Sequence, residues 1–333
     1  LGSDGTTGSL ASSSNIYMHR GTNLITNRSD NITLANYIKN WDSYGPTWNN
    51  VDTQSNKFIQ NGTGTVTLSN NSNDFYGKLQ AVNGGLTITG SAGNSGNYVT
   101  NNGQAIVFNT TNATSNNQYI NNISGTGTLR VTGTGKLELY NSSNGTFTGA
   151  TTIDSGATLQ LDYGKLGGDI TNNGTLYFYS PSSMNYAGVI SGSGNVKQNY
   201  GTLTFSGANT YTGNTLIGPD GGSTFYLGNG GTTGSLASAS NISVGSGSTL
   251  YFNRSNAMTV ANTISGAGAV SLVTQSGRDW NTDPSAIVTL TGDNTYTGIT
   301  YLNPFTQLQL GSGGTTGSIA SSSTIYMHRG TNL

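Results

Sequence analysis

Residues 207–215 read Gly-Ala-Asn-Thr-Tyr-Thr-Gly-Asn-Thr, and residues 292–300 repeat this motif as Gly-Asp-Asn-Thr-Tyr-Thr-Gly-Ile-Thr. Each copy follows a run in which apolar and polar residues alternate, Thr-Leu-Thr-Phe at 202–205 and Val-Thr-Leu-Thr at 288–291. Such alternation indicates half-buried β-strands, and the intervening glycine, asparagine and serine residues are typical of turns. Glycine interrupts nearly every window of about ten residues, which costs a helix about 1 kcal/mol each time. The sequence therefore predicts an all-β protein built from short strands.

The chain also repeats itself over longer distances. Residues 1–24 and 310–333 are identical at 21 of 24 positions, and the opening Leu-Gly-x-x-Gly-Thr-Thr-Gly-Ser motif returns from Leu227. Shorter modules are marked by an isoleucine followed by a glycine-rich turn, at Ile59, Ile123, Ile190 and Ile264. Modules of unequal length that follow one another are typical of a solenoid, in which each coil rests only on its neighbours.

We therefore expect a parallel β-helix, or β-solenoid, of about 15–16 coils, since roughly 20 residues is a usual length for one coil. The expected organisation is a single continuous β-helix over 1–333 that is a segment of a longer tandem array. Its approximate modules are 1–58, 59–122, 123–189, 190–263 and 264–333, with loop insertions at 40–57 and 275–285. Asparagine, threonine and serine residues in register are expected to form side-chain ladders between coils.

The composition is poor in charge and contains no cysteine. Charged residues make up 8% of the 333 residues, and the formal net charge is −1. Electrostatic attraction to nucleic acid or to an anionic membrane is therefore not expected. The absence of cysteine excludes disulfides and thiolate metal sites. The 18 tyrosines and 9 phenylalanines distinguish the chain from a disordered polar linker, because such linkers contain few aromatic residues.

The motif at 207–215 resembles the passenger-associated repeat of autotransporter proteins. The copy at 292–300, which leads to Leu-Gln-Leu-Gly at 308–311, fits equally well, and a more degenerate copy begins at 144–149 and ends at 159–161. The resemblance implies a right-handed parallel β-helix. It also implies export to the surface of a Gram-negative bacterium, usually within an adhesin or a very large surface protein.

Residues able to support catalysis are sparse. His19 and His328 occupy the same repeat position, and a single histidine in each repeat cannot supply a metal cluster or a Ser–His–Asp site. Parallel β-helices also host polysaccharide lyases and hydrolases, which need paired carboxylates, but the 13 acidic residues are scattered along the sequence. The Asn-Thr-Asp at 281–283 resembles one motif of the polygalacturonase family, without the Asp-Asp and Gly-His-Gly companions. We therefore expect no enzyme activity, no metal ion and no cofactor.

Two insertions rich in aromatic residues, at 40–57 and 275–285, interrupt the modules and are expected to leave the coil as loops. Exposed tryptophan and tyrosine side chains on such loops are suited to stacking on sugar rings or on partner proteins. The alternative is that the rings fold back and cover the flank of the β-helix. The candidate ligand-contacting residues are Trp41, Tyr44, Trp48, Arg278 and Trp280.

Three functional hypotheses follow. The first is a non-enzymatic, extracellular structural segment that forms a stiff β-helical stalk or fibre on or outside a bacterial cell. The second is an adhesin passenger that binds glycans or proteins through its aromatic loops, and a polysaccharide-active β-helix enzyme is a distant third. The expected partners are neighbouring repeats of the same chain end to end, identical chains laterally, and glycans or host or cell-surface proteins. Neither binding to nucleic acid nor membrane insertion by this segment is expected.

Overall fold

The computed structural model describes residues 1–19, 21–40, 56–75, 77–91, 98–101, 103–112, 117–140, 147–163, 166–273, 286–320 and 323–333. Apart from a 3-10 turn at Thr110–Asn112, the elements formed by these residues are β-strands. No helix in this part of the chain is long and apolar enough to cross a bilayer. The chain divides into an N-terminal unit, Leu1–Gly174, and a C-terminal unit, Thr175–Leu333. The five modules expected from the sequence, from 1–58 to 264–333, stay a prediction.

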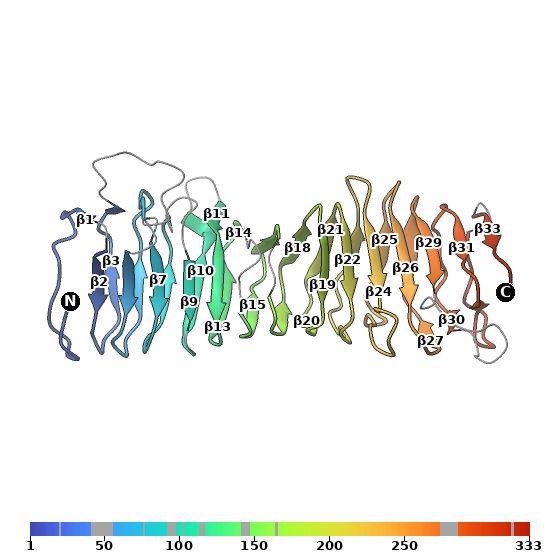
Figure 1. The fold of residues 1–333 in the computed structure, drawn as a ribbon, viewed down its shortest axis with the longest axis horizontal. Helices are drawn as coiled ribbons and strands as arrows, with labels where there is room; N and C mark the ends of the chain where they lie inside the picture. Colours follow the sequence, from blue (N-terminus) through green and yellow to red (C-terminus); the bar gives the residue numbers. More distant parts are fainter. Residues whose placement is uncertain are drawn as a thin grey trace. The chain divides into compact units, whose positions relative to one another are not determined.

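The N-terminal unit consists of short parallel strands that follow one another from coil to coil (Figure 1). Its sheets have the strand orders β1-β4, β2-β5-β7-β9-β12, β3-β6-β8-β10-β13-β15-β17 and β11-β14-β16. The strands are β1 (Ile16–Met18), β2 (Asn23–Thr26), β3 (Ile32–Leu34), β4 (Ile38–Asn40), β5 (Lys57–Gln60), β6 (Val66–Leu68), β7 (Lys78–Ala81), β8 (Leu86–Ile88), β9 (Tyr98–Asn101), β10 (Ala105–Asn109), β11 (Asn117–Ile120), β12 (Asn122–Gly125), β13 (Thr128–Thr132), β14 (Lys136–Leu139), β15 (Thr151–Ile153), β16 (Thr158–Leu161) and β17 (Ile170–Asn172).

The C-terminal unit is built in the same way (Figure 1). Its strand orders are β18-β21-β23-β25-β28, β19-β22-β24-β26-β29-β31-β33 and β27-β30-β32. The strands are β18 (Thr175–Tyr179), β19 (Ser183–Tyr186), β20 (Ile190–Ser191), β21 (Asn195–Asn199), β22 (Thr202–Phe205), β23 (Thr215–Ile217), β24 (Thr224–Leu227), β25 (Ile242–Val244), β26 (Thr249–Asn253), β27 (Met258–Val260), β28 (Ile264–Gly266), β29 (Ala269–Val273), β30 (Ala286–Leu290), β31 (Thr300–Leu302), β32 (Thr306–Leu310) and β33 (Ile325–Met327).

The register between coils is parallel throughout, although the coils differ in length. Ile32 pairs with Val66 and Val66 pairs with Leu86, so two successive coils use 34 and then 20 residues. This arrangement confirms the predicted all-β parallel solenoid. Over the described residues it makes about 12 turns rather than 15–16, because several coils are longer than the assumed 20 residues. Parallel crossovers are right-handed in nearly all proteins, and a right-handed helix remains our expectation.

Inward-facing side chains of successive coils pack directly on one another. In the C-terminal unit, Leu203, Phe225, Leu250 and Val270 pair in register and all four are buried. The Phe225 ring also meets the ring of Phe205 edge to face, with 5.0 Å between their centres. Burying one such side chain contributes about 1.5–3 kcal/mol, so the stabilisation is distributed along the array.

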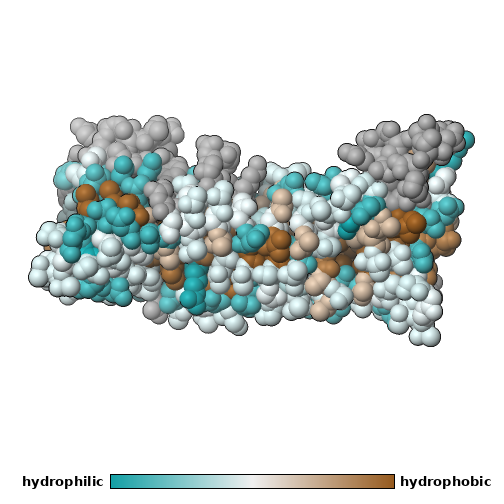
Figure 2. Space-filling model, turned by 90° about the horizontal axis from the view of Figure 1, so that it is seen from below, coloured by the Kyte–Doolittle hydropathy of each residue, from teal (hydrophilic) through white to brown (hydrophobic). Residues whose placement is uncertain are grey.

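Polar side chains satisfy the backbone at the corners. The buried amide of Gln198 donates to the carbonyl oxygens of Tyr200, Gly201 and Thr224. The Asn61 amide donates to Asn27 Oδ1 at 3.3 Å, and the Asn83 amide donates to Asn61 Oδ1 at 3.3 Å, which is a side-chain ladder of the expected kind. Most of the face in Figure 2 is accordingly pale or hydrophilic, and hydrophobic residues form small patches on it.

Candidate functional site

The asparagine of the repeated motif joins three coils. Asn209 Oδ1 accepts a hydrogen bond from the backbone nitrogen of Ile190 in the preceding coil at 2.9 Å. Its Nδ2 donates to the carbonyl oxygen of Gly207 at 3.2 Å and to that of Ser235, in the following coil, at 3.3 Å. A buried side chain with this set of partners fixes the position of each coil relative to the next.

The second copy of the motif makes the same contacts. Asn294 Oδ1 accepts from the backbone nitrogen of Ile264 at 2.9 Å, and Asn294 Nδ2 donates to the carbonyl oxygens of Gly292 at 2.8 Å and Ser318 at 2.9 Å. The matching sequence therefore corresponds to a matching hydrogen-bond network.

The tyrosine of the motif is an internal hydrogen-bonding residue. Tyr211 is fully buried, and its phenol oxygen lies 2.6 Å from Thr215 Oγ1, which in turn lies 3.1 Å from Ser240 Oγ in the next coil. Tyr296 is equally buried and is bonded to Thr300 Oγ1 at 2.7 Å. Burial raises the pKa of both phenols, so each stays neutral and available as a hydrogen-bond donor.

The motif glycine permits close contact between coils. A Cβ atom on Gly213 would lie 2.2 Å from the carbonyl oxygen of Gly194, and one on Gly298 would lie 2.0 Å from that of Gly268. No side chain fits at these distances. The asparagine, tyrosine, threonine and glycine of the motif thus all serve the stacking of coils.

The degenerate copy in the N-terminal unit retains only part of this arrangement. Phe147 takes the place of the tyrosine and is buried, and a Cβ atom on Gly149 would again clash with a backbone oxygen, that of Gly127. Thr151, four residues after Phe147, has a buried hydroxyl oxygen that finds no hydrogen-bond partner. The phenylalanine thus fills the space of the tyrosine without supplying its hydroxyl group.

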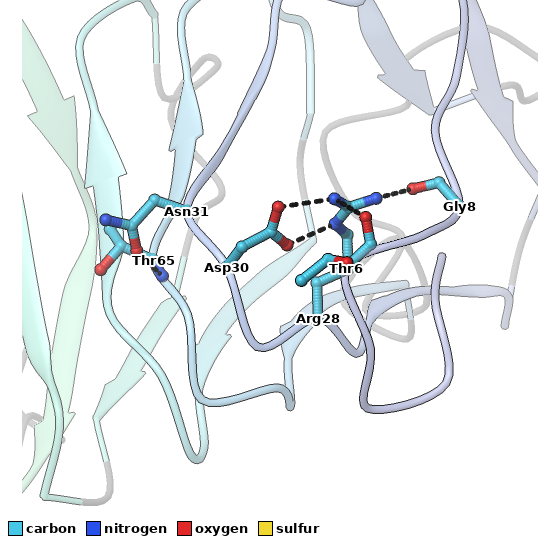
Figure 3. Close-up of polar contacts among 6 residues, drawn as sticks. All are labelled: Thr6, Gly8, Arg28, Asp30, Asn31 and Thr65. Atoms are coloured by element: carbon cyan, nitrogen blue, oxygen red, sulfur yellow. Dashed lines mark hydrogen bonds and ion pairs between the residues drawn. The ribbon is translucent and has the colours of Figure 1, made fainter.

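A second recurring contact holds the Thr-Thr-Gly-Ser loops. The Arg28 guanidinium donates through Nε and Nη2 to the Asp30 carboxylate, at 2.8 and 2.7 Å, and to the carbonyl oxygens of Thr6 and Gly8 (Figure 3). In the same figure, the backbone nitrogen of Thr65 donates to Asn31 Oδ1 at 2.8 Å. The guanidinium lowers the pKa of Asp30 by hydrogen bonding to it.

The C-terminal unit contains an equivalent of this loop clamp. Arg254 donates to the carbonyl oxygens of Thr232 and Gly234 and, at 3.0 Å, to Asn256 Oδ1. Asn256 takes the position that Asp30 has in the N-terminal unit. Both arginines therefore use carbonyl oxygens of the repeated loop.

One group of charged residues on the N-terminal unit was not evident from the sequence. The Lys136 ammonium donates to Gln160 Oε1 at 2.9 Å and pairs with Glu138, while Gln160 Nε2 donates to Asp162 Oδ1 at 2.6 Å. Burial is the main cause of a raised Asp162 pKa. The two carboxylates, scattered in sequence, come together because Glu138 pairs with Gln160 one coil away. Each is engaged by a lysine or an amide, as in a structural ion network rather than an acid–nucleophile pair.

The histidines lie at equivalent exposed turns of their units. The carbonyl oxygen of His19 accepts from Thr22 Oγ1 at 2.6 Å, and that of His328 accepts from Thr331 Oγ1 at 2.7 Å. Within the described ranges, no group of three or more histidine, cysteine, aspartate or glutamate residues could hold a metal ion.

The ligand-contacting residues predicted from the sequence, Trp41, Tyr44, Trp48, Arg278 and Trp280, lie outside the described residues. Other aromatic residues on the outer faces of strands were missed, because the sequence reasoning looked for binding residues only in insertions. Among them are two stacked pairs, Tyr226 with Tyr251 and Tyr301 with Tyr326, and a group around Tyr179 and Tyr200. The signal that would have found them is a tyrosine at an alternate position of one strand and another tyrosine at the matching position of the strand one coil away.

Comparison with known proteins bears on the repeated motif. The profile of the Passenger-associated-transport-repeat family matches residues 129–161, 196–218 and 285–303, which include parts of the degenerate copy and of the two full copies of the motif. The chain is also 32% identical over 143 residues to the Autotransporter adhesin/invasin TibA of Escherichia coli O78:H11 (strain H10407 / ETEC). That match spans 42% of the chain and 13% of TibA, and no solved structure matches. The chain therefore carries passenger-associated-transport repeats on a parallel β-solenoid and resembles the passenger proteins of autotransporters.

Proposed function

We propose that this chain is a non-enzymatic, surface-exposed passenger segment of a Gram-negative bacterial protein, and that it acts as a stiff stalk or fibre. The observation that carries the proposal is the Asn209 contact, in which one side chain binds backbone groups of three successive coils. Its repetition at Asn294 supports a role of the motif in coil stacking. Cooperative stacking of this kind supplies length and resistance to proteolysis without disulfides.

The location is tested by antibodies raised against residues 1–333. Antibodies added to intact cells of the source bacterium should label them, and added protease should remove the label. Labelling only after permeabilisation would contradict the surface location. Electron micrographs of the native parent protein should show long unbranched rods, and compact particles would contradict the stalk. Cleavage of a polysaccharide by the chain would contradict the non-enzymatic role.

Adhesion is the second candidate function, and TibA, an adhesin/invasin by name, supports it. In this proposal Trp41, Tyr44, Trp48, Arg278 and Trp280 contact glycans or cell-surface proteins, as their residue types favour. Cells that display the chain should adhere to host cells, and Trp48→Ala or Trp280→Ala should weaken that adhesion. Unchanged adhesion by both variants would place binding elsewhere on the chain.

A further inference from the structure

The parallel register of the C-terminal unit brings three tyrosines together on one outer face. Strand β18 pairs with β21 so that Tyr177 lies beside Lys197 and Tyr179 lies beside Asn199. Tyr200 follows directly at the end of β21. The group Tyr177, Tyr179, Tyr200, Lys197, Asn199 and Asp220 is called the tyrosine cluster below.

The rings of this cluster are arranged edge to face. Tyr179 meets Tyr177 with ring centres 5.7 Å apart at an interplanar angle of 68°, and it meets Tyr200 at 5.5 Å and 85°. By contrast, Tyr226 and Tyr251 stack at 4.6 Å and 19°, so each covers a face of the other. Tyr179 and Tyr200 keep 39% and 43% of their surface exposed, which leaves aromatic surface available to a flat apolar ligand face.

A buried amide accompanies the exposed rings. Asn199 is 2% exposed, and its Nδ2 donates to the Tyr177 phenol oxygen at 2.9 Å and to the Asp220 carboxylate. Asn199 Oδ1 finds no donor in the protein. That oxygen is shielded from solvent, whereas the Asp220 side chain is 60% exposed, so the carboxylate is the acceptor that a hydroxyl group from outside the chain can reach.

The backbone of Tyr200 is a further observation. Its φ angle of 62° lies in the left-handed region, which glycine and asparagine adopt readily and tyrosine does not. The corner is held from within by Gln198, which donates to the Tyr200 carbonyl oxygen. A backbone outlier at a residue that keeps 43% of its surface exposed marks this corner as a candidate functional position.

The charges of the cluster are balanced. Lys197 Nζ lies 3.9 Å from the Asp220 carboxylate and 4.9 Å from the centre of the Tyr177 ring. With one cation opposite one anion, the surface attracts neither polyanions nor polycations strongly.

We propose that the tyrosine cluster binds a neutral saccharide. The C–H face of a pyranose ring stacks on one of the exposed rings, Tyr179 or Tyr200, and contacts the edge of the other, while sugar hydroxyl groups bind the Asp220 carboxylate. This inference rests on the proposed function, because a passenger exposed at the cell surface meets glycans there. It names a site on the strands of the solenoid, separate from the two aromatic insertions.

The test uses the purified 333-residue chain and isothermal titration with neutral hexasaccharides of β-1,4-glucose, β-1,4-N-acetylglucosamine and α-mannose, with oligogalacturonate as the acidic probe. At least one neutral glycan should bind more tightly than oligogalacturonate. Tyr179→Ala and Tyr200→Asn should each weaken that binding about tenfold or more. Because asparagine tolerates a positive φ, Tyr200→Asn should keep or raise the thermal midpoint, which separates loss of binding from loss of folding.

Tyr326→Ala is the matched control, since Tyr326 is 53% exposed in the same unit but stacks on Tyr301. It should leave glycan affinity unchanged, and an equal loss would overturn the proposal. The proposal is also overturned if no neutral glycan binds or if oligogalacturonate binds best. It is overturned as well if a protein ligand, and no glycan, binds at the tyrosine cluster. Surface labelling of intact cells is independent of these results, so a labelled cell with no glycan binding refutes the cluster and leaves the passenger proposal standing.

Discussion

The phenol oxygen of Tyr211 lies 2.6 Å from Thr215 Oγ1, four residues further along the same coil. Neither group is exposed to solvent. The same spacing separates Phe147 from Thr151, whose buried hydroxyl has no partner. The Tyr211–Thr215 pair thus contains the hydrogen bond that the Phe147–Thr151 pair lacks.

The substitution Phe147→Tyr should therefore stabilise the protein. A phenol at this position is expected to bind Thr151 Oγ1 and to increase the free energy of unfolding by about 1 kcal/mol, the usual net value of a hydrogen bond. Urea unfolding followed by circular dichroism measures the change. The reciprocal variant Tyr211→Phe should lose a similar amount, and a loss of stability in Phe147→Tyr would show that the two corners differ in shape.

Removal of the motif asparagine should be more damaging. Asn209→Ala leaves the backbone nitrogen of Ile190 and two carbonyl oxygens without their partner, so the free energy of unfolding should fall by about 2–3 kcal/mol. Asn214→Ala is the control in the same motif, because the Asn214 side chain is exposed, and a change within about 0.5 kcal/mol is expected. Equal effects of the two variants in urea unfolding would contradict the proposed role of Asn209.

The motif glycine should not tolerate even a methyl group. In Gly213→Ala the new Cβ atom would lie 2.2 Å from the Gly194 carbonyl oxygen, and forcing the coils apart should cost about 1–3 kcal/mol or more. Gly314→Ala is the comparison, since nothing lies within 4 Å of a Cβ atom there. Thermal midpoints of the two variants, measured side by side, should differ clearly, and similar midpoints would refute close coil contact at Gly213.

Asp162 should make stability depend on pH. Burial raises the pKa of the folded-state carboxyl above its ordinary value of about 3.9, so the contribution of Asp162 to stability is present below that value and is lost as the pH rises through the raised folded pKa. The Asp162→Asn variant lacks this titrating group. Its free energy of unfolding relative to that of the wild type should therefore increase as the pH rises through the raised folded pKa of Asp162. Urea unfolding at a series of pH values tests this, and a difference that is constant with pH would show that Asp162 ionises freely.

The solenoid itself could be predicted from alternation and repetition, because alternating strands recur along the chain and the corner motif returns at 207–215 and 292–300. The number of turns could not, since the coils from Ile32 to Val66 and from Val66 to Leu86 differ by 14 residues while both keep a full register. Residue count therefore does not determine coil count.

The candidate sites were harder to predict, for a related reason. Glu138 and Asp162, or Tyr179 and Tyr200, are neighbours only because one coil lies in a particular register on the next. A pattern along the sequence does not contain that register. The aromatic insertions at 40–57 and 275–285 and the role of Trp48 and Trp280 in binding stay predictions.

The Arg28 and Arg254 contacts have a consequence for the gene. Each arginine binds its loop through main-chain carbonyl oxygens, which every residue possesses. Both arginines follow a copy of the Leu-Gly-x-x-Gly-Thr-Thr-Gly-Ser peptide. Unequal crossing-over between DNA copies that encode these peptides would join coils whose contacts already match. A chain lengthened or shortened in this way would keep an arginine and its carbonyl partners together at the junction.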